Sequence, residues 1–330
     1  MKNRQVTLKA RPVGEPKADD FELVEADVPE PGPNSVLVRA QYLSVDPYQR
    51  GRMREARSYA KPLELGDVIT SQTVGEVVES RSDRFSPGDV VVGQLGWQEY
   101  AVAPAHTLRK VPADVPPAAA LHVLGTTGLT AYFGLFDIGK PKPGDTVVVS
   151  AAAGAVGEVV GQLAKLAGCR AVGIAGGPQK AADILDYGYE AAVDYKNDDV
   201  GARLKETCPN GVDVYFDNVG GGLTDLVLRR LGLNARVVVC GQISQYNLEE
   251  PELGPRLLPL LIVHRARIEG FLVTDYAHRY TEVVPRLARW LAEGKLRYRE
   301  HVIEGIENAP RAFIGMLRGE NRGKTLVRLT

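Results

Sequence analysis

The stretch Thr-Val-Val-Val-Ser-Ala-Ala-Ala-Gly-Ala-Val-Gly at residues 146–157 decides the fold of this chain. Its β-branched residues predict a strand, its small residues predict a tight turn, and an apolar helical pattern over 155–167 follows at once. This order brings the unpaired N–H groups of a helix N-terminus to the end of a strand, where they bind phosphate. The spacing Ala152-x-Gly154-x-x-Gly157 matches the dinucleotide-binding fingerprint, with alanine in place of its first glycine. The stretch therefore predicts a site for the pyrophosphate of a dinucleotide.

The two glycines of this spacing have separate expected roles. Gly154 would let the backbone approach the pyrophosphate, and Gly157 would let the helix pack closely on the strand. An ordinary strand-to-helix turn rich in small residues is the alternative, because short glycine patterns are common. Since the strand and the helix both stand in the required places, the sequence favours the nucleotide site.

The residues after the second expected strand, 170–175, indicate which nucleotide binds. Enzymes that use NAD usually place an acid there, which accepts hydrogen bonds from the ribose 2′-hydroxyl. Here the strand is followed by Gly-Gly-Pro-Gln-Lys at 176–180, and the first acid is Asp183. An acid would repel a 2′-phosphate and a lysine attracts one, although Lys180 is also compatible with a plain solvated charge. The pattern favours NADP(H) over NAD(H).

Composition and charge limit the class of protein. The chain has 330 residues, of which 44% are hydrophobic, so it is long enough for two domains with proper cores. A formal net charge of −1 gives no electrostatic reason to bind nucleic acid or an anionic membrane. No apolar run approaches the length of a bilayer span, and the first residues show no charged-then-apolar leader. We expect a soluble, cytoplasmic protein.

The cysteines and histidines do not have the spacing of a metal site. Cys169, Cys208 and Cys240 are isolated, so the sequence contains neither a disulfide framework nor a Cys-x-x-Cys motif. Zinc needs about three or four thiolate or imidazole ligands in a tetrahedral arrangement. The five histidines are scattered along the chain without such spacing. We expect no metal.

Two kinds of segment follow one another along the chain. Residues 1–120 carry short β-type runs between proline- and glycine-rich turns, which is typical of an antiparallel β domain, here a partly open barrel. From 121 to 298, expected strands alternate with helical stretches, which indicates a doubly wound parallel sheet with helices on both faces. The tail, 299–330, carries a strand, a helix and a final strand, and we expect it to join the N-terminal domain. The proline-rich segment 251–261 is expected to be a mobile loop. The expected strands of the parallel sheet are 146–150, 170–175, 192–194, 212–217, 235–240 and 267–273.

Several motifs spread over the whole length occur in the order known from one family. They are SVDPYQR at 44–50, LGTTGLTAY at 124–132, SAAAGAVG at 150–157, VYFDNVGG at 214–221, CGQISQY at 240–246 and RIEGF at 267–271. With these motifs the chain resembles the zinc-independent alkenal/one oxidoreductase branch of the medium-chain dehydrogenases/reductases. That branch contains prostaglandin and leukotriene reductases, plant double-bond reductases and bacterial curcumin-reductase-like enzymes. So many motifs in order are a more specific signal than the glycine spacing alone.

The resemblance implies a GroES-like domain, a Rossmann domain that binds NADP(H), and a homodimer. It implies that NADPH reduces the carbon–carbon double bond of an α,β-unsaturated aldehyde or ketone. Asn218 and Cys240 also have independent support as binding residues, because each ends an expected strand, where α/β sheets bind ligands. The cofactor contacts that the resemblance implies are Gly154, Ala155, Val156 and Gly157 for the pyrophosphate, Lys180 and Tyr195 for the 2′-phosphate end, Asn218, Cys240, Gly241, Gln242, Ile243, Ser244, Gln245 and Tyr246 for the nicotinamide half, Phe271, Leu272 and Val273 for the carboxamide, and Asn321 from the tail.

The expected chemistry needs a hydrogen-bond donor for the carbonyl oxygen, which becomes negatively charged as the hydride adds to the β-carbon. Without zinc to polarise the carbonyl, hydroxyls take this role: Tyr48 first, Tyr246 second, and a ribose hydroxyl of the cofactor third. A phenol or water then protonates the α-carbon. Some family members have a tyrosine in the segment that corresponds to 260–265, and this chain has none there. The departure leaves the donor open, and Tyr48 is equally compatible with half-buried packing.

Two other functions fit the same residues. An NADPH:quinone oxidoreductase of the same superfamily needs little more than bound NADPH. A non-catalytic NADPH-binding scaffold or sensor needs binding alone. Turnover of unsaturated carbonyls and of quinones would separate the three functions.

Overall fold

The computed structural model describes residues 2–329, which divide into two compact units. One unit contains the residues up to 122 together with those from 300 onward, and the other contains 123–299. The sequence places these boundaries after 120 and after 298. Each unit has its own sheet, so each is described by itself.

The unit 123–299 is built on a six-stranded sheet in which all neighbouring strands are parallel. The strand order is β10-β9-β8-β11-β12-β13, which is the 3-2-1-4-5-6 order of a doubly wound Rossmann sheet. The chain reverses its winding direction between β8 and β11, and the carboxyl ends of such strands are where open α/β sheets bind ligands. The strands are β8 (Thr146–Ser150), β9 (Arg170–Ala175), β10 (Ala191–Asp194), β11 (Val212–Asp217), β12 (Leu231–Val239) and β13 (Arg267–Gly270).

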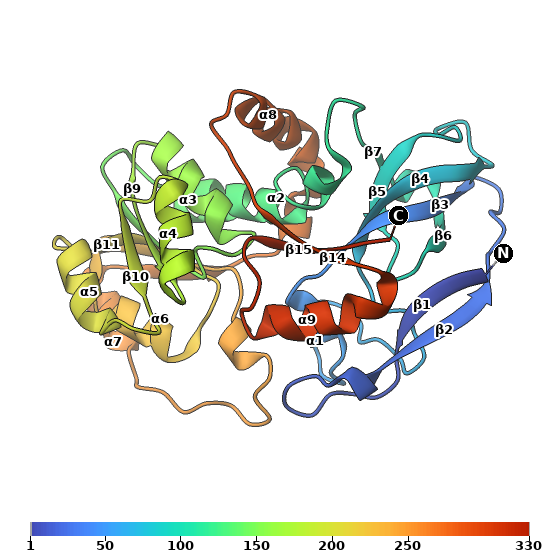
Figure 1. Ribbon diagram of the computed structural model, residues 1–330. Coiled ribbons are helices and arrows are strands. Elements are labelled where there is room, and N and C mark those ends of the chain that lie inside the picture. Colours follow the sequence, from blue (N-terminus) through green and yellow to red (C-terminus); the bar gives the residue numbers. More distant parts are fainter. Residues whose placement is uncertain (1, 330) are drawn as a thin grey trace. The chain divides into compact units, whose positions relative to one another are not determined.

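Helices pack against this sheet because its strands are apolar on both faces. Val147, Val148 and Val149, in the middle of β8, have no exposed surface. Figure 1 shows the helices arranged around the sheet. They are α2 (Thr126–Phe133), α3 (Gly157–Leu166), α4 (Pro178–Asp186), α5 (Val200–Thr207), α6 (Gly221–Leu228), α7 (Leu258–His264) and α8 (Tyr280–Ala292).

The structure corrects several expected bounds in this unit. β12 begins at Leu231, earlier than the expected 235. Its first residues were not expected to form a strand, because the glycine at 232 and the asparagine at 234, whose φ is 60°, weaken the β pattern. β13 ends at Gly270, since a 3₁₀ turn begins at Val273. The segment 251–261 is not all loop: α7 begins at Leu258, and the proline that follows lies in the first turn, where it needs no N–H partner.

The other unit is built from mostly antiparallel strands. Its seven-stranded sheet has the order β14-β15-β3-β4-β5-β7, and β6 also pairs with β3. A separate two-stranded sheet, β1 with β2, was not expected from the sequence. The strands are β1 (Lys2–Leu8), β2 (Phe21–Asp27), β3 (Ser35–Ser44), β4 (Gln72–Ser80), β5 (Val90–Gln94), β6 (Tyr100–Pro104), β7 (Arg109–Lys110), β14 (Glu300–Glu304) and β15 (Lys324–Arg328), and the helices are α1 (Tyr48–Arg52) and α9 (Ala309–Leu317).

The C-terminal tail completes this sheet. β14 lies parallel to β15, and β15 pairs antiparallel with β3, with Leu326 opposite Ser44. The tail also contributes Phe313, which packs edge-on against the buried Trp97 at 5.9 Å between ring centroids. The start of β15 therefore lies beside the end of β3. The predicted fold class, a Rossmann domain with a second domain rich in β-strands, is confirmed.

Within residues 2–329, every helix is either too short or too polar to cross a lipid bilayer.

Candidate functional site

The turn between β8 and α3 has the close packing that the sequence predicts. A Cβ atom added to Gly157 would lie 2.4 Å from the carbonyl oxygen of Ala151, so only glycine fits there. A Cβ added to Gly154 would meet only that same oxygen, at 3.2 Å, so the turn is more open at Gly154. Ala155 and Val156 belong to the turn, because α3 begins at Gly157, two residues later than expected. The expected helix start is therefore wrong, and the backbone at Gly154 is less crowded than at Gly157.

The loop after β9 carries the residues expected at the 2′-phosphate. Gly177 has a φ of 91°, and Lys180 lies in the first turn of α4. Tyr195, which is half exposed, lies on the backbone of this loop: a Cβ added to Gly176 would come within 2.7 Å of its ring. The glycines thus allow the Tyr195 ring to approach the loop that leads to Lys180.

Two acids lie near this loop, and both carboxylates have protein partners. Asp183 forms an ion pair with Arg299 at 2.6 Å between Oδ1 and Nη1. Asp194, at the end of β10, accepts a hydrogen bond from the backbone N–H of Gly177 at 2.6 Å, and its second oxygen accepts one from the Asn197 side chain at 2.6 Å. Burial opposes ionisation, but these hydrogen bonds lower the pKa of Asp194 below its usual range. The sequence analysis did not single out Asp194, whose only signal was its place at a strand end.

Asn218 lies directly after β11 and is fixed to the end of β8. Its side-chain amide donates to the carbonyl oxygen of Ser150 at 2.7 Å, and its backbone N–H donates to the Ser150 hydroxyl at 2.8 Å. These two hydrogen bonds bring the ends of the strands at the switch point together. The role of Ser150 as a hydrogen-bond partner of Asn218 was not predicted from the sequence.

The segment 240–246 lies against the turn that follows β11. The backbone N–H of Cys240 donates to the carbonyl oxygen of Asp217 at 2.9 Å, and the Ser244 hydroxyl donates to Val219 at 2.7 Å. The Tyr246 hydroxyl accepts a hydrogen bond from the backbone N–H of Gln242 at 3.2 Å. The candidate residues of this segment therefore lie at the carboxyl ends of β11 and β12 in the Rossmann sheet.

The Cys240 thiol is not suited to nucleophilic chemistry. Burial, with a smaller effect from the charge of Asp217, raises the pKa of Cys240 to about 12. Because the thiolate is the nucleophile, Cys240 is inert at neutral pH.

Phe271, Leu272 and Val273 follow β13 as irregular chain and the start of a 3₁₀ turn. The Phe271 ring packs against the backbone of Gly134, where an added Cβ would come within 2.7 Å of it. These three residues therefore follow directly after the carboxyl end of β13 and are no longer part of the sheet.

Tyr48 and Asn321 belong to the other unit. Tyr48 opens α1, and its buried hydroxyl has no hydrogen-bond partner among residues 2–329. Burial, and next to it the charge of Asp46, raises the pKa of Tyr48 well above that of an ordinary phenol. Thr70 lies near enough to oppose this shift in part, but it does not reach hydrogen-bond geometry. Tyr48 therefore keeps its proton at neutral pH.

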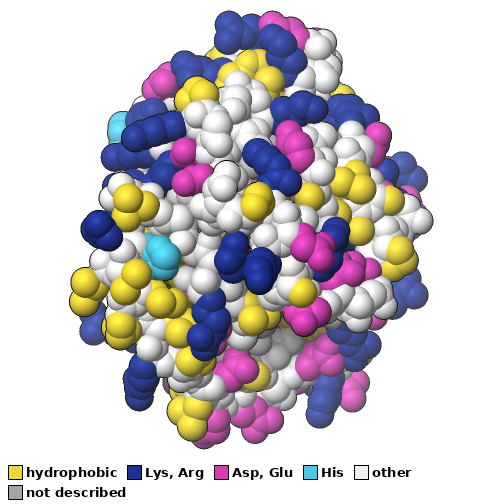
Figure 2. Space-filling view, turned by 90° about the vertical axis from the view of Figure 1, so that its left-hand side faces the viewer, with side chains coloured by type: hydrophobic (Ala, Val, Ile, Leu, Met, Phe, Trp, Pro, Cys, Tyr) yellow, Lys and Arg dark blue, Asp and Glu magenta, His cyan; other side chains and the backbone are white. Residues whose placement is uncertain are grey.

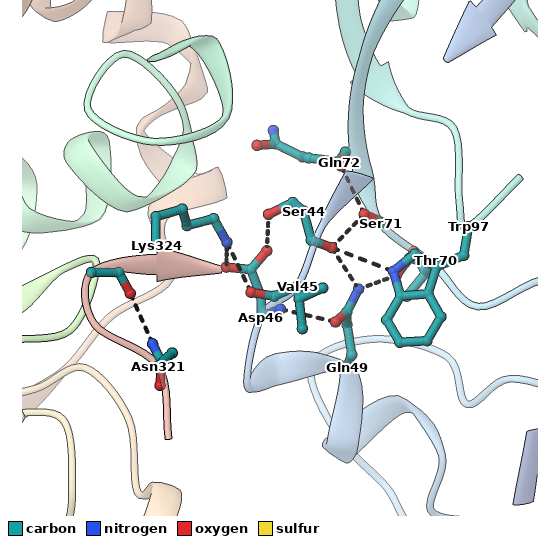
Figure 3. Close-up of polar contacts among 11 residues, drawn as sticks. Ser44, Val45, Asp46, Gln49, Thr70, Ser71, Gln72, Trp97, Asn321 and Lys324 are labelled. Carbon is teal, nitrogen blue, oxygen red and sulfur yellow. Dashed lines mark hydrogen bonds and ion pairs between the residues drawn. The ribbon is translucent and has the colours of Figure 1, made fainter. Parts of the chain in front are cut away.

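A polar network fixes the chain just before Tyr48 (Figure 3). The buried Lys324, at the start of β15, donates to the Asp46 carboxylate at 2.6 Å and to the carbonyl oxygen of Val45 at 2.9 Å. The second Asp46 oxygen accepts a hydrogen bond from the Ser44 hydroxyl. Asn321, three residues before Lys324, donates to the carbonyl oxygen of Gly323 at 2.8 Å. The sequence analysis missed Lys324, because nothing in the sequence brings residue 324 to residue 46.

No group of three or more His, Cys, Asp or Glu side chains that could hold a metal ion occurs in the described part of the chain. All three cysteines are free.

Comparison with known proteins identifies the family. A family model described as the N-terminal domain of oxidoreductase matches residues 4–111, and one described as zinc-binding dehydrogenase matches 155–289. The NADPH-dependent curcumin reductase of Escherichia coli is 45% identical over 99% of this chain and 97% of its own. The NADP(+)-dependent 2-alkenal reductase of Nicotiana tabacum is 45% identical over 98% of this chain and 97% of its own.

The chain belongs to the alkenal/one reductase branch of the medium-chain dehydrogenases/reductases. The family that the motifs suggest is thereby confirmed. A crystal structure of CurA from Vibrio vulnificus in complex with NADPH superposes on this alkenal/one reductase with a TM-score of 0.95, at 45% identity and with 99% of each chain covered. The predicted cofactor, NADP(H), is confirmed at the level of the family.

Proposed function

We propose that the protein uses NADPH to reduce the carbon–carbon double bond of α,β-unsaturated aldehydes and ketones. The observation that carries this proposal is similarity over the whole chain to reductases of this chemistry. The loop after β9, where we expect the 2′-phosphate, agrees with this proposal. Both acids near that loop, Asp183 and Asp194, are engaged by protein groups.

We propose the following contacts for the cofactor. The turn from Gly154 to Gly157 offers backbone N–H groups to the pyrophosphate. Lys180 and Tyr195 would hold the 2′-phosphate end, because Lys180 follows the glycine loop after β9 and the Tyr195 ring packs against Gly176 of that loop. Asn218, the residues from 240 to 246 and those from 271 to 273 would surround the nicotinamide half at the carboxyl ends of β11, β12 and β13. Asn321, in the tail, is a further proposed cofactor contact.

NADPH, when bound, supplies a hydride to the β-carbon of the substrate. Negative charge then develops on the carbonyl oxygen, and a hydrogen-bond donor stabilises it. We propose Tyr48 as this donor, because its hydroxyl is buried, protonated and without a protein partner. With its raised pKa, Tyr48 is a poor acid, so water protonates the α-carbon. Tyr246 is the second candidate donor, although its hydroxyl already accepts a hydrogen bond from Gln242.

We propose that the reaction needs no zinc. Catalytic zinc requires about three protein ligands in a tetrahedral arrangement, and residues 2–329 offer no such group of side chains. Hydroxyls would polarise the carbonyl instead.

We also propose that the protein is a homodimer located in the cytoplasm. β13 lies at the edge of the Rossmann sheet with all four residues exposed, and exposed strand edges pair with other chains. The neighbouring α7 exposes Leu258, Ile262 and Val263. Figure 2 shows hydrophobic side chains gathered at the lower left of the face that it presents. Three free cysteines suit a reducing compartment.

The proposed function is tested by following NADPH oxidation with 2-alkenals, enones and benzoquinone, each with NADPH and with NADH. We expect turnover of the alkenals and enones, with NADPH strongly preferred. Replacing Lys180 by alanine should raise KM for NADPH about 10- to 100-fold and leave KM for NADH within about twofold, because it removes a charged partner of the 2′-phosphate. Lys205, an exposed lysine on α5, is the matched control. Turnover of quinones alone, or tight NADPH binding without turnover of any substrate, would refute the proposal.

A further inference from the structure

Asp217, the last residue of β11, is a fully buried carboxylate. No lysine or arginine among residues 2–329 forms an ion pair with it. A buried charge is costly unless hydrogen bonds satisfy it. Six donors do so here: Oδ1 accepts from Tyr215 Oη (2.9 Å), Ser150 Oγ (3.2 Å) and the backbone N–H groups of Val219 and Gly220 (both 3.0 Å), and Oδ2 accepts from Thr224 Oγ1 (2.6 Å) and Gln242 Nε2 (3.1 Å).

Four of these donors come from three separate segments at the carboxyl end of the sheet. Ser150 ends β8 and begins the pyrophosphate turn, Val219 and Gly220 form the turn after Asn218, and Gln242 belongs to the segment 240–246. Ser150 extends the network, because its hydroxyl accepts from the backbone N–H of Asn218 at 2.8 Å while it donates to Asp217. One carboxylate therefore connects the ends of β8, β11 and β12.

The contact between Gly220 and Gln242 shows how closely these segments fit. Gly220 has a φ of 78°, and a Cβ added there would lie 2.2 Å from Oε1 of Gln242. The Gln242 side chain is thus held between the backbone of Gly220 and the Asp217 carboxylate. Its amide is the only side-chain donor from the segment 240–246 to reach Asp217 within residues 2–329.

We propose that Asp217 is a positioning residue for the nicotinamide half of NADPH. It does not contact the cofactor, because both of its oxygens are occupied by protein donors. It holds Asn218 and the segment 240–246 in the arrangement that receives the nicotinamide. This inference rests on the cofactor contacts proposed above.

The charge of Asp217 is essential to this role. An asparagine has the same shape, but one of its two terminal atoms is a donor. An amide nitrogen in place of Oδ2 would face the Gln242 amide donor, whereas the Thr224 hydroxyl is able to accept instead. Asp217→Asn therefore releases Gln242 and the segment that carries it.

The test compares two ligands in isothermal titration calorimetry. NADPH carries the nicotinamide, and 2′,5′-ADP carries only the adenosine and 2′-phosphate half. For D217N we expect Kd for NADPH to rise about tenfold or more, and Kd for 2′,5′-ADP to change by less than about twofold. The fluorescence of bound NADPH should also shift toward that of free NADPH, because the nicotinamide loses its fixed surroundings.

The matched control is Asp213→Asn. Asp213 lies on the same strand, and its carboxylate accepts from the backbone N–H of Thr146 at 2.8 Å, near the amino end of β8. D213N should leave both Kd values within about twofold of the wild type. If D217N does not fold, Ser150→Ala removes the hydroxyl that bridges Asp217 to Asn218, and it should show the same split between the two ligands.

Equal weakening of both ligands, or no weakening of NADPH binding in a folded D217N or S150A variant, would overturn the inference. If the wild-type protein binds NADPH and reduces enones, but the variants do not weaken NADPH binding more than 2′,5′-ADP binding, the inference is wrong and the proposed function stands. Wild-type protein that neither binds NADPH nor reduces enones would overturn the proposed function, and the inference with it.

Discussion

At the scale of single residues, Tyr48 differs from an ordinary buried tyrosine. A tyrosine hydroxyl that is buried usually finds a hydrogen-bond partner, and that of Tyr48 has none among residues 2–329. Asp46 lies close enough to raise its pKa further, so the phenol is held neutral. A neutral donor without a protein partner is what a developing enolate oxygen requires.

Replacing Tyr48 by phenylalanine removes only this hydroxyl. We expect kcat for an enone to fall about 100-fold, because one donor to a developing oxyanion is lost. The Kd for NADPH should stay within about twofold. Steady-state kinetics and fluorescence titration measure the two quantities, and Tyr100→Phe, on β6 of the same unit, is the matched control. Unchanged turnover in Y48F would eliminate the proposed role.

The pH dependence of kcat tests the protonation state of Tyr48. Because the pKa of Tyr48 is raised, the donor keeps its proton as the pH passes through the range where a free phenol ionises. Its contribution is present at neutral pH and is lost only above the raised pKa. We therefore expect no alkaline fall of kcat between about pH 9 and about pH 11 that depends on Tyr48. A fall in this range that disappears in Y48F would contradict the assignment.

The sequence singled out Tyr48 and the expected pyrophosphate turn as candidates, because each lies in a short contiguous motif. It did not identify Lys324, Asp194 or Asp217, whose roles come from contacts between distant segments. Asp217 lies within a motif that was recognised, yet nothing in the motif reveals that six donors from separate segments converge on it.

At the scale of elements, the ion pair of Lys324 and Asp46 connects β15 to the chain after β3. Lys324 is 1% exposed and the Asp46 side chain 15%, so neither charge is well solvated. Burial lowers the pKa of Lys324, and the Asp46 carboxylate opposes that shift. The pair ties the tail to the segment that carries Tyr48.

Replacing Lys324 by methionine leaves the Asp46 carboxylate without its cation. We expect the free energy of unfolding to fall by about 3 kcal/mol, as is typical when one partner of a buried pair is removed. The double variant K324M/D46N should recover part of this loss. Urea denaturation measures both changes. The exposed pair of Lys2 and Asp27 is the control, and K2M should cause no measurable loss. A loss no larger than that of K2M would show that the pair is not structural.

Elements were predictable where local pattern and tertiary setting agree. The valine run of β8 is apolar throughout, and its predicted bounds, 146–150, are those observed. β12 contains a glycine and an asparagine with positive φ, so its first residues read as a turn. α7 lies in a proline-rich segment, and a proline in the first helical turn gives the same sequence signal as a proline in a loop.

At the scale of the whole molecule, the open edge of the Rossmann sheet bears on assembly. β13 has a strand partner on one side only among the described residues, and α7, which precedes it in the chain, exposes apolar side chains. An exposed edge of this kind is a hazard unless another chain covers it. A second copy of the same chain would cover the same surface on both partners.

An aspartate at Ile262, which is 80% exposed on α7, tests this assembly. We expect wild-type protein to show the mass of two chains in size-exclusion chromatography with light scattering, and I262D to show that of one, because a charge would be buried at the interface. Leu185→Asp, at an exposed apolar position on α4, should leave the mass unchanged. A wild-type mass of one chain would refute the dimer.

In the proposed reaction, a hydride from NADPH adds to the β-carbon of a conjugated carbonyl. The most direct measurement uses NADPH that carries deuterium at C4, in each of its two stereochemical forms, with an enone as substrate. We expect one of the two forms to give a saturated ketone with a single deuterium at the β-carbon, as read by NMR and mass spectrometry of the product. Deuterium at the carbonyl carbon of an allylic alcohol, or a product without deuterium from both forms, would contradict hydride transfer to the β-carbon.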